Sequence, residues 1–165
     1  MKIIYSSEKK YILKKLNEQF GIEKLPYLLL KFGDQRKFKK FSGPENSGNF
    51  SGDKLRIYSG DLATEELRVL NANLKIENIG LYFAKEEKDG IRLTLDGIQI
   101  IKNQITKNIL EISDKQADDW LRGNDLDIKA KKGFLILKNN NEFLGCGKST
   151  GERIANFVPK ERRIK

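Results

Sequence analysis

Two segments of the sequence have the pattern of a strand, a short turn and a second strand, and this pattern constrains the fold most. In residues 79–95 apolar residues alternate on both sides of Lys88-Asp89-Gly90, and the runs 133–138 and 142–148 flank Asn139-Asn140-Asn141. Alternation with a period of two places the apolar side chains on one face of a strand, and Gly, Asn and Asp favour the tight turns of hairpins. The sequence therefore predicts two β-hairpins, one before and one after residue 100.

A helix is predicted near the beginning of the chain. Ser6 or Ser7 can cap its first turn, and Gly21 is well placed to end it. Its apolar residues recur at four-residue spacing, at Ile12, Leu16 and Phe20. This face is expected to pack inward.

The next elements complete a first domain over residues 1–102. Short apolar runs at 27–32 and 55–58 predict strands, and the Ser, Gly and Asn residues of 42–53 predict an exposed loop between them. Residues 61–71 predict a short helix beneath the sheet, with inward apolar residues at Leu62, Leu67, Val69 and Leu70. Together with the first hairpin, these elements predict an N-terminal α/β domain.

Residues 103–165 have shorter elements joined by tight turns. Ser113-Asp114-Lys115-Gln116 is a capping-box sequence, which predicts a short helix that carries Trp120 and stops at Gly123. With the second hairpin, this helix predicts a small β-barrel with one helix against it. The fold class expected for the whole chain is therefore α+β.

Composition argues against most catalysis and for a polyanionic partner. The chain has no His and one Cys, which removes the commonest general base and the usual zinc ligands, so we expect no enzyme, metal or cofactor. The formal net charge of +9 favours nucleic acid, although a solvated lysine-rich surface is an alternative. No apolar run is long enough to span a bilayer, so we expect a cytoplasmic protein without a membrane partner.

Residues 145–149, Gly-Cys-Gly-Lys-Ser, suggest a phosphate-binding loop, but Glu142 stands where the first glycine of such a loop should be. The favoured interpretation is a strand whose glycines allow close approach by a neighbouring backbone. Cys146 could be a nucleophile, but no activating residue adjoins it in the sequence, and a buried, inert thiol is the favoured alternative.

Basic residues in and after the second hairpin form the main RNA-binding hypothesis. The planar guanidinium groups of arginines grip phosphates and can pair with base edges. A fraying charged terminus is the alternative. The candidate residues are Lys129, Lys132, Lys148, Arg153, Lys160, Arg162 and Arg163.

A secondary basic patch is predicted where cations and phenylalanines interleave between residues 31 and 41. The cations would bind phosphates, and the aromatic rings would stack on bases. The alternative is a solvated strand with a buried Phe. The candidate cations of this patch are Lys37, Lys39 and Lys40, accompanied by Lys31 and Arg36.

Three ordered stretches, at 120–126, 132–137 and 143–148, resemble a PUA-like domain. The run from 151 to 163 resembles the RNA-binding tail of RNA cytosine-5 methyltransferases of the Sun/Fmu family. Residues 56–96 are similar to the pre-PUA domain of two-domain ribosome-biogenesis proteins of archaea and eukaryotes. The glycines of the PUA motif in this sequence are Gly123, Gly133, Gly145 and Gly147.

These resemblances imply a pre-PUA domain that meets protein partners and a PUA-like barrel that holds RNA, either rRNA or tRNA. The cofactor-binding Gly loop and paired catalytic cysteines of the methyltransferases are absent from the sequence. We therefore expect an RNA-binding accessory protein in rRNA processing or ribosomal subunit assembly. The alternatives are a substrate-binding partner of an RNA-modifying enzyme, such as a methyltransferase, and a protein adaptor with incidental basic charge.

Overall fold

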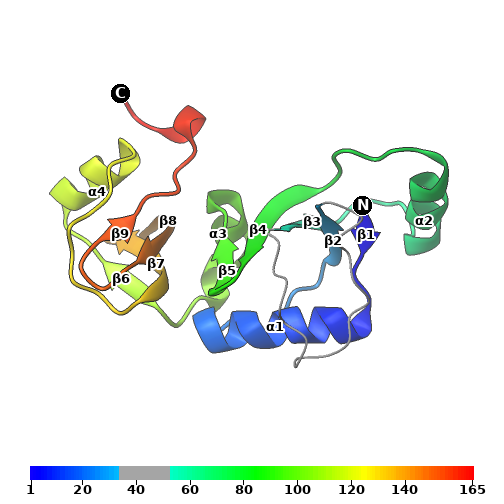
Figure 1. Cartoon of the computed structure of the whole chain (residues 1–165), viewed down its shortest axis with the longest axis horizontal. Helices are drawn as coiled ribbons and strands as arrows, with labels where there is room; N and C mark the ends of the chain where they lie inside the picture. The colour runs from blue at the N-terminus through cyan, green and yellow to red at the C-terminus, as the bar shows by residue number, and fades with distance from the viewer. Residues whose placement is uncertain (34–52) are drawn as a thin grey trace.

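Two β-sheets, one before and one after residue 100, organise the computed structural model, which describes residues 1–33 and 53–165. The first sheet has five strands in the order β1-β2-β3-β4-β5, and the second has four in the order β6-β7-β8-β9. Figure 1 shows helix α1 along one side of the first sheet and helix α4 beside the second. The second sheet curls into a half-barrel, so the predicted α+β class, with an α/β region before a PUA-like barrel, is confirmed.

All neighbouring strands of the first sheet run antiparallel. The predicted strands at 27–32 and 55–58 and the first predicted hairpin are confirmed. The strands are β1 (Lys2–Ile3), β2 (Leu28–Phe32), β3 (Lys54–Tyr58), β4 (Leu81–Glu87) and β5 (Gly90–Leu93).

Helix α1 (Ser6–Phe20) covers one face of this sheet and confirms the predicted apolar stripe, with Ile12, Leu16 and Phe20 fully buried. It ends at Gly21, whose φ of 81° is a left-handed conformation that glycine adopts without a steric penalty. The predicted serine cap is wrong, because the N-cap residue is Tyr5 and no side chain caps the helix there.

Helix α2 (Thr64–Asn73) confirms the helix predicted over 61–71 but not its burial. Leu67 is fully buried, whereas Leu62 is 40% exposed and Val69 is 55% exposed. Figure 1 shows the reason: α2 lies beyond the β1 edge of the sheet, so little of its surface meets the sheet.

Helix α3 (Leu95–Ile101) and the short 3-10 helix η3 (Lys102–Gln104) follow β5 directly. The prediction that alternation continues in a strand to Leu95 is wrong, because Thr94 starts the helix and its Oγ1 accepts a hydrogen bond from Gly97 N at 3.0 Å. In the described part of the chain, no helix is both long and apolar enough to cross a membrane.

In the second sheet, β6 pairs with β7 in parallel and the other pairs are antiparallel. The predicted hairpin is confirmed, with Asn140 in the left-handed region at φ 51°. Helix α4 (Asp114–Leu121) begins at the predicted Ser113 capping box. The strands are β6 (Ile109–Glu111), β7 (Gly133–Asn139), β8 (Glu142–Ser149) and β9 (Ile154–Ala155), followed by the 3-10 helix η4 (Lys160–Arg162).

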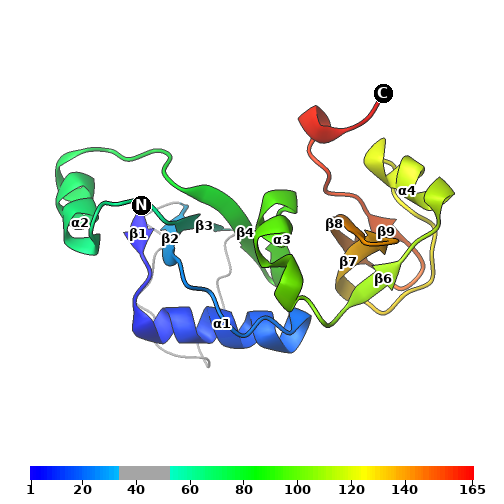
Figure 2. The same ribbon diagram turned by 180° about the vertical axis from the view of Figure 1, so that it is seen from behind.

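The largest apolar cluster joins the two sheets. It includes Phe83 and Leu93 from the first sheet and Ile136 and Cys146 from the second. Both ribbon views show α3 between the sheets, and Gln99 of α3 donates a hydrogen bond to the Phe143 carbonyl of β8 at 3.2 Å (Figures 1 and 2). The division into domains at residues 102 and 103 stays a prediction.

Candidate nucleic-acid interface

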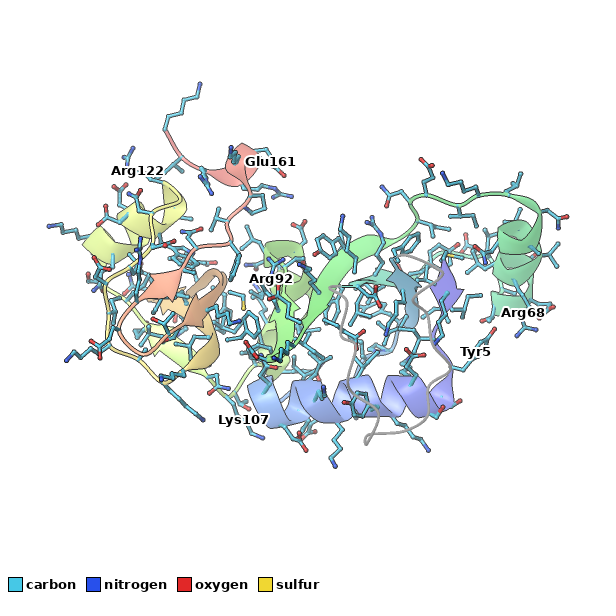
Figure 3. All side chains as sticks on the ribbon, in the orientation of Figure 1. Tyr5, Arg68, Arg92, Lys107, Arg122 and Glu161 are labelled. Atoms are coloured by element: carbon cyan, nitrogen blue, oxygen red, sulfur yellow. The ribbon has the colours of Figure 1, made fainter. Side chains whose placement is uncertain are left out.

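The segment after β9 is held against α4 by hydrogen bonds. Asn156 Nδ2 donates to the carbonyls of Trp120 at 2.7 Å and Asn124 at 2.9 Å, and Ile164 N donates to the Leu121 carbonyl at 3.1 Å. Arg163 Nε donates to the Val158 carbonyl at 3.1 Å. The basic tail is therefore tied to the second sheet region along its length, and η4 lies near the end of α4 (Figure 3, where Glu161 and Arg122 are labelled).

Two of the predicted RNA-binding arginines contact carboxylates of the protein itself. Arg153 Nη2 lies 3.0 Å from Asp125 Oδ2, and Arg162 Nη2 lies 3.2 Å from Asp96 Oδ1. The two arginine side chains remain 61% and 54% exposed. Because exposed ion pairs typically contribute only ~0–1 kcal/mol, a phosphate can compete for such guanidinium groups.

Two of the predicted lysines are also paired. Lys148 Nζ lies 2.6 Å from Asp89 Oδ2, which connects β8 to the turn between β4 and β5. Lys129 Nζ lies 3.6 Å from Glu152 Oε2. Part of the positive charge expected at the RNA surface is thus compensated within the fold.

The seven candidates fall into three groups rather than one continuous face. The first group is Lys129, Lys132 and Arg153. The two lysines lie beside the turn that precedes Arg153, because Ala130 N donates to the Gly151 carbonyl at 3.1 Å. A second group, Lys160, Arg162 and Arg163, lies in and next to η4. Lys148 stands apart on β8, facing the first sheet.

The secondary patch is only partly open to description. Lys37, Lys39 and Lys40, with Arg36, lie outside the described residues. Lys31 does not belong to an exposed patch, because its ammonium group lies between Glu8 and Glu86 and its side chain is only 11% exposed. Including Lys31 in that patch was therefore wrong, since the sequence does not show which carboxylates fold against a strand lysine.

Two of the motif glycines, Gly147 and Gly123, allow close packing within the protein. Gly147 lies within β8, and a Cβ atom placed on it would stand 2.5 Å from Ile154 Cγ2 and 2.9 Å from Trp120 Cη2. Gly123 has φ 92° and lies under the Arg163 side chain. Gly133 and Gly145 also have positive φ. The strand interpretation of residues 145–148 is confirmed.

Cys146 lies within β8 and is buried, and burial raises the pKa of its thiol to about 12. Below that pH the thiol stays protonated, so it is a poor nucleophile. Among the described residues, no group of three or more His, Cys, Asp and Glu side chains is placed to hold a metal ion.

We expect the folded protein at pH 8 to resist alkylation of Cys146 by iodoacetamide. The unfolded chain should react readily, because its thiol regains an ordinary pKa of about 8.5. Mass spectrometry of the labelled protein with and without denaturant checks this difference. Rapid labelling of the folded protein would show that the thiol is accessible and ionised.

Sequence reasoning did not single out three cations of the first sheet. Lys54, Lys85 and Arg92 lie at the polar positions of β3, β4 and β5 and face away from α1. The alternation of apolar and polar residues along these strands could have identified them, because it places the three cationic side chains on one face of the sheet.

Residues 107–164 match the family described as "Methyltransferase RsmF PUA domain". A Psychromonas ingrahamii protein named "Ribosomal RNA small subunit methyltransferase F" is 31% identical over 107 residues, which cover 61% of this chain and 22% of the relative. An Aeromonas hydrophila protein of the same name is 27% identical over 128 residues, which cover 76% of this chain and 26% of the relative. The matched region is thus about a quarter or less of these relatives.

Proposed function

We propose that this chain is the substrate-binding half of an rRNA-modifying system, holding ribosomal RNA for a methyltransferase through residues 107–164. The observation that carries this proposal is the match of that segment to the RsmF PUA domain. The matched segment contains the half-barrel, α4 and most of the basic tail, which are the parts that sequence analysis assigned to RNA.

The names of the relatives favour one of two functions considered from the sequence, an accessory role in ribosome assembly and a partner role beside an RNA-modifying enzyme. The two proteins described above are both named as small-subunit rRNA methyltransferases. This favours a role beside an RNA-modifying enzyme over a general role in ribosome assembly. The resemblance of residues 56–96 to ribosome-biogenesis proteins stays a prediction.

Binding would begin by electrostatic capture. Arg153 and Arg162 are exposed and already held in place by Asp125 and Asp96, so exchanging a carboxylate for a phosphate needs little rearrangement. Lys132 and Lys160 are exposed and extend the same two groups. No catalytic step is proposed for this chain, because its single thiol is buried and protonated.

Changing both Arg153 and Arg162 to Gln should weaken binding to a small-subunit rRNA fragment and flatten its salt dependence. Each phosphate contact contributes about 0.7 to 0.9 to the slope of log affinity against log salt, so the slope should fall by roughly 1.4 to 1.8. Fluorescence anisotropy at several salt concentrations measures both quantities. Arg163 is left unchanged because its hydrogen bond to Val158 holds the tail.

A matched control is Arg68→Gln together with Lys75→Gln. Both cations are exposed and paired with a carboxylate close by in the sequence, and Arg68 lies on α2, far from the tail (Figure 3). The control has the same net charge as the test variant. Equal slopes for the test variant and the unchanged protein would remove Arg153 and Arg162 from the interface.

A further inference from the structure

Three cations stand in a row across neighbouring strands on the face of the first sheet that points away from α1. Lys54 of β3 is directly opposite Lys85 of β4, and Lys85 is directly opposite Arg92 of β5. Neighbouring strands lie about 4.8 Å apart, and like charges directly opposite one another destabilise a sheet. This row therefore costs folding free energy unless an anion lies against it.

Among the residues that the structure describes, the compensation of this row is incomplete. The carboxylate paired with it there is Glu87, 3.7 Å from Lys85 Nζ and 3.0 Å from Arg92 Nε. The opposite face shows what full compensation looks like, because the neighbouring Lys2 and Lys31 there meet two carboxylates, Glu8 and Glu86. Within residues 1–33 and 53–165, the outward row therefore keeps an excess of positive charge.

Aromatic rings lie beside the cations of this face. Lys54 Nζ is 5.6 Å from the centre of the Tyr82 ring, and Arg92 Cζ is 4.4 Å from the centre of the Phe157 ring. Phe32 lies beside Arg56, which is opposite Tyr82 in the sheet. The Tyr82, Phe157 and Phe32 rings are only partly buried, so a flat group can still reach them.

From this arrangement we infer that the outward face of β3, β4 and β5 binds single-stranded RNA, with Lys54 and Lys85 on phosphates and Tyr82 stacked on a base. Cations that follow a backbone beside aromatic faces are the means by which proteins hold single strands. The bases of a duplex are stacked on one another and are not free to meet these rings. Protein interfaces are depleted of lysine, which argues against a protein at this row.

This inference deepens the proposed function and rests on it. Phe157 belongs to the segment after β9, within the residues matched to the RsmF PUA domain. Its contact with Arg92 makes the outward face continuous with the C-terminal part. A strand held by the tail can thus continue over the first sheet.

The test is the binding of a labelled oligouridylate of about 16 nucleotides, which is long enough for both surfaces. Changing both Lys54 and Lys85 to Gln should reduce the salt slope by about 1.4, from two single-strand phosphate contacts. Tyr82→Leu should weaken binding roughly tenfold, through lost stacking, and leave the slope nearly unchanged. Thermal unfolding of the lysine variant should show equal or greater stability, because like charges are removed.

The control changes both Lys10 and Lys14 to Gln, on the exposed side of α1 and thus on the opposite side of the sheet. This control lowers the net charge by the same amount as the Lys54 and Lys85 variant, and it should leave the salt slope of binding unchanged. An equal fall in slope for this control would show a general charge effect and overturn the inference. If the sheet variants bind normally while the Arg153 and Arg162 variant binds weakly, the inference fails and the proposed function stands.

Discussion

Replacing Lys31 with Met is expected to destabilise the protein by about 3–5 kcal/mol, because it leaves two buried carboxylates without their shared cation. Lys31 Nζ lies 2.9 Å from Glu8 Oε1 and also contacts Glu86 Oε2. The side chains of Glu8 and Glu86 are only 10% and 7% exposed. Chemical denaturation at neutral pH measures the loss.

An exposed pair provides the comparison. Lys75→Met removes a cation 2.7 Å from Glu77, but both side chains are largely in solvent, so the unfolding midpoint should barely move. The double variant Lys31→Met with Glu86→Gln should regain part of the stability, since the unpaired carboxylate of Glu86 is gone and Glu8 keeps its ion pair with Lys2. Equal stability of Lys31→Met and the unchanged protein would mean that solvent reaches the cluster.

The same cluster makes the folding stability of the protein depend on pH. Burial alone would raise the pKa of Glu8, but hydrogen bonds from Lys2 and Lys31 outweigh it and hold that pKa below its ordinary value. A lowered carboxyl pKa stabilises the fold fully above the unfolded value of about 4.3, and this contribution is lost as pH falls through the folded value. In Lys31→Met the stability deficit should shrink in acid, because protonation removes the unpaired buried charge.

Local signals in the sequence predicted the elements whose causes are local. The Ser113 capping box, the left-handed Gly21 and the turn at Asn140 each depend on a few neighbouring residues, and each is found where the pattern placed it. Helix α3 was missed because Leu95 continues the alternation of the preceding strand, although Thr94 carried a capping signal.

The candidate site was less predictable because its electrostatics depend on tertiary contacts. Arg162 meets Asp96 of α3, and Lys148 meets Asp89, more than 50 residues away. Composition gives the excess of cations but does not show which of them the fold pairs. The partly compensated row at Lys54 and Lys85 likewise depends on strand register, which a single sequence specifies only weakly.

Replacing Trp120 with Ala should cost about 3–5 kcal/mol, since the largest side chain of the second apolar cluster is lost and a cavity remains. Trp120 is fully buried, its Nε1 donates to the Leu144 carbonyl at 3.0 Å, and its ring packs over Gly147. Thermal unfolding followed by circular dichroism measures the loss. Ile100→Ala, at a side chain 42% exposed, should change little and serves as the control.

Substitution of Trp120 should also affect RNA binding. Asn156, which leads into the basic tail, donates a hydrogen bond to the Trp120 carbonyl, so a shift of α4 moves the tail with it. Trp120→Phe retains most of the ring volume and should fold, which allows its RNA affinity to be measured at a temperature where it is fully native. Weaker RNA binding by this folded variant, with no change in its salt slope, would show that α4 positions the arginines rather than supplying charge. Unchanged affinity would mean that the tail holds its position without the packing of Trp120.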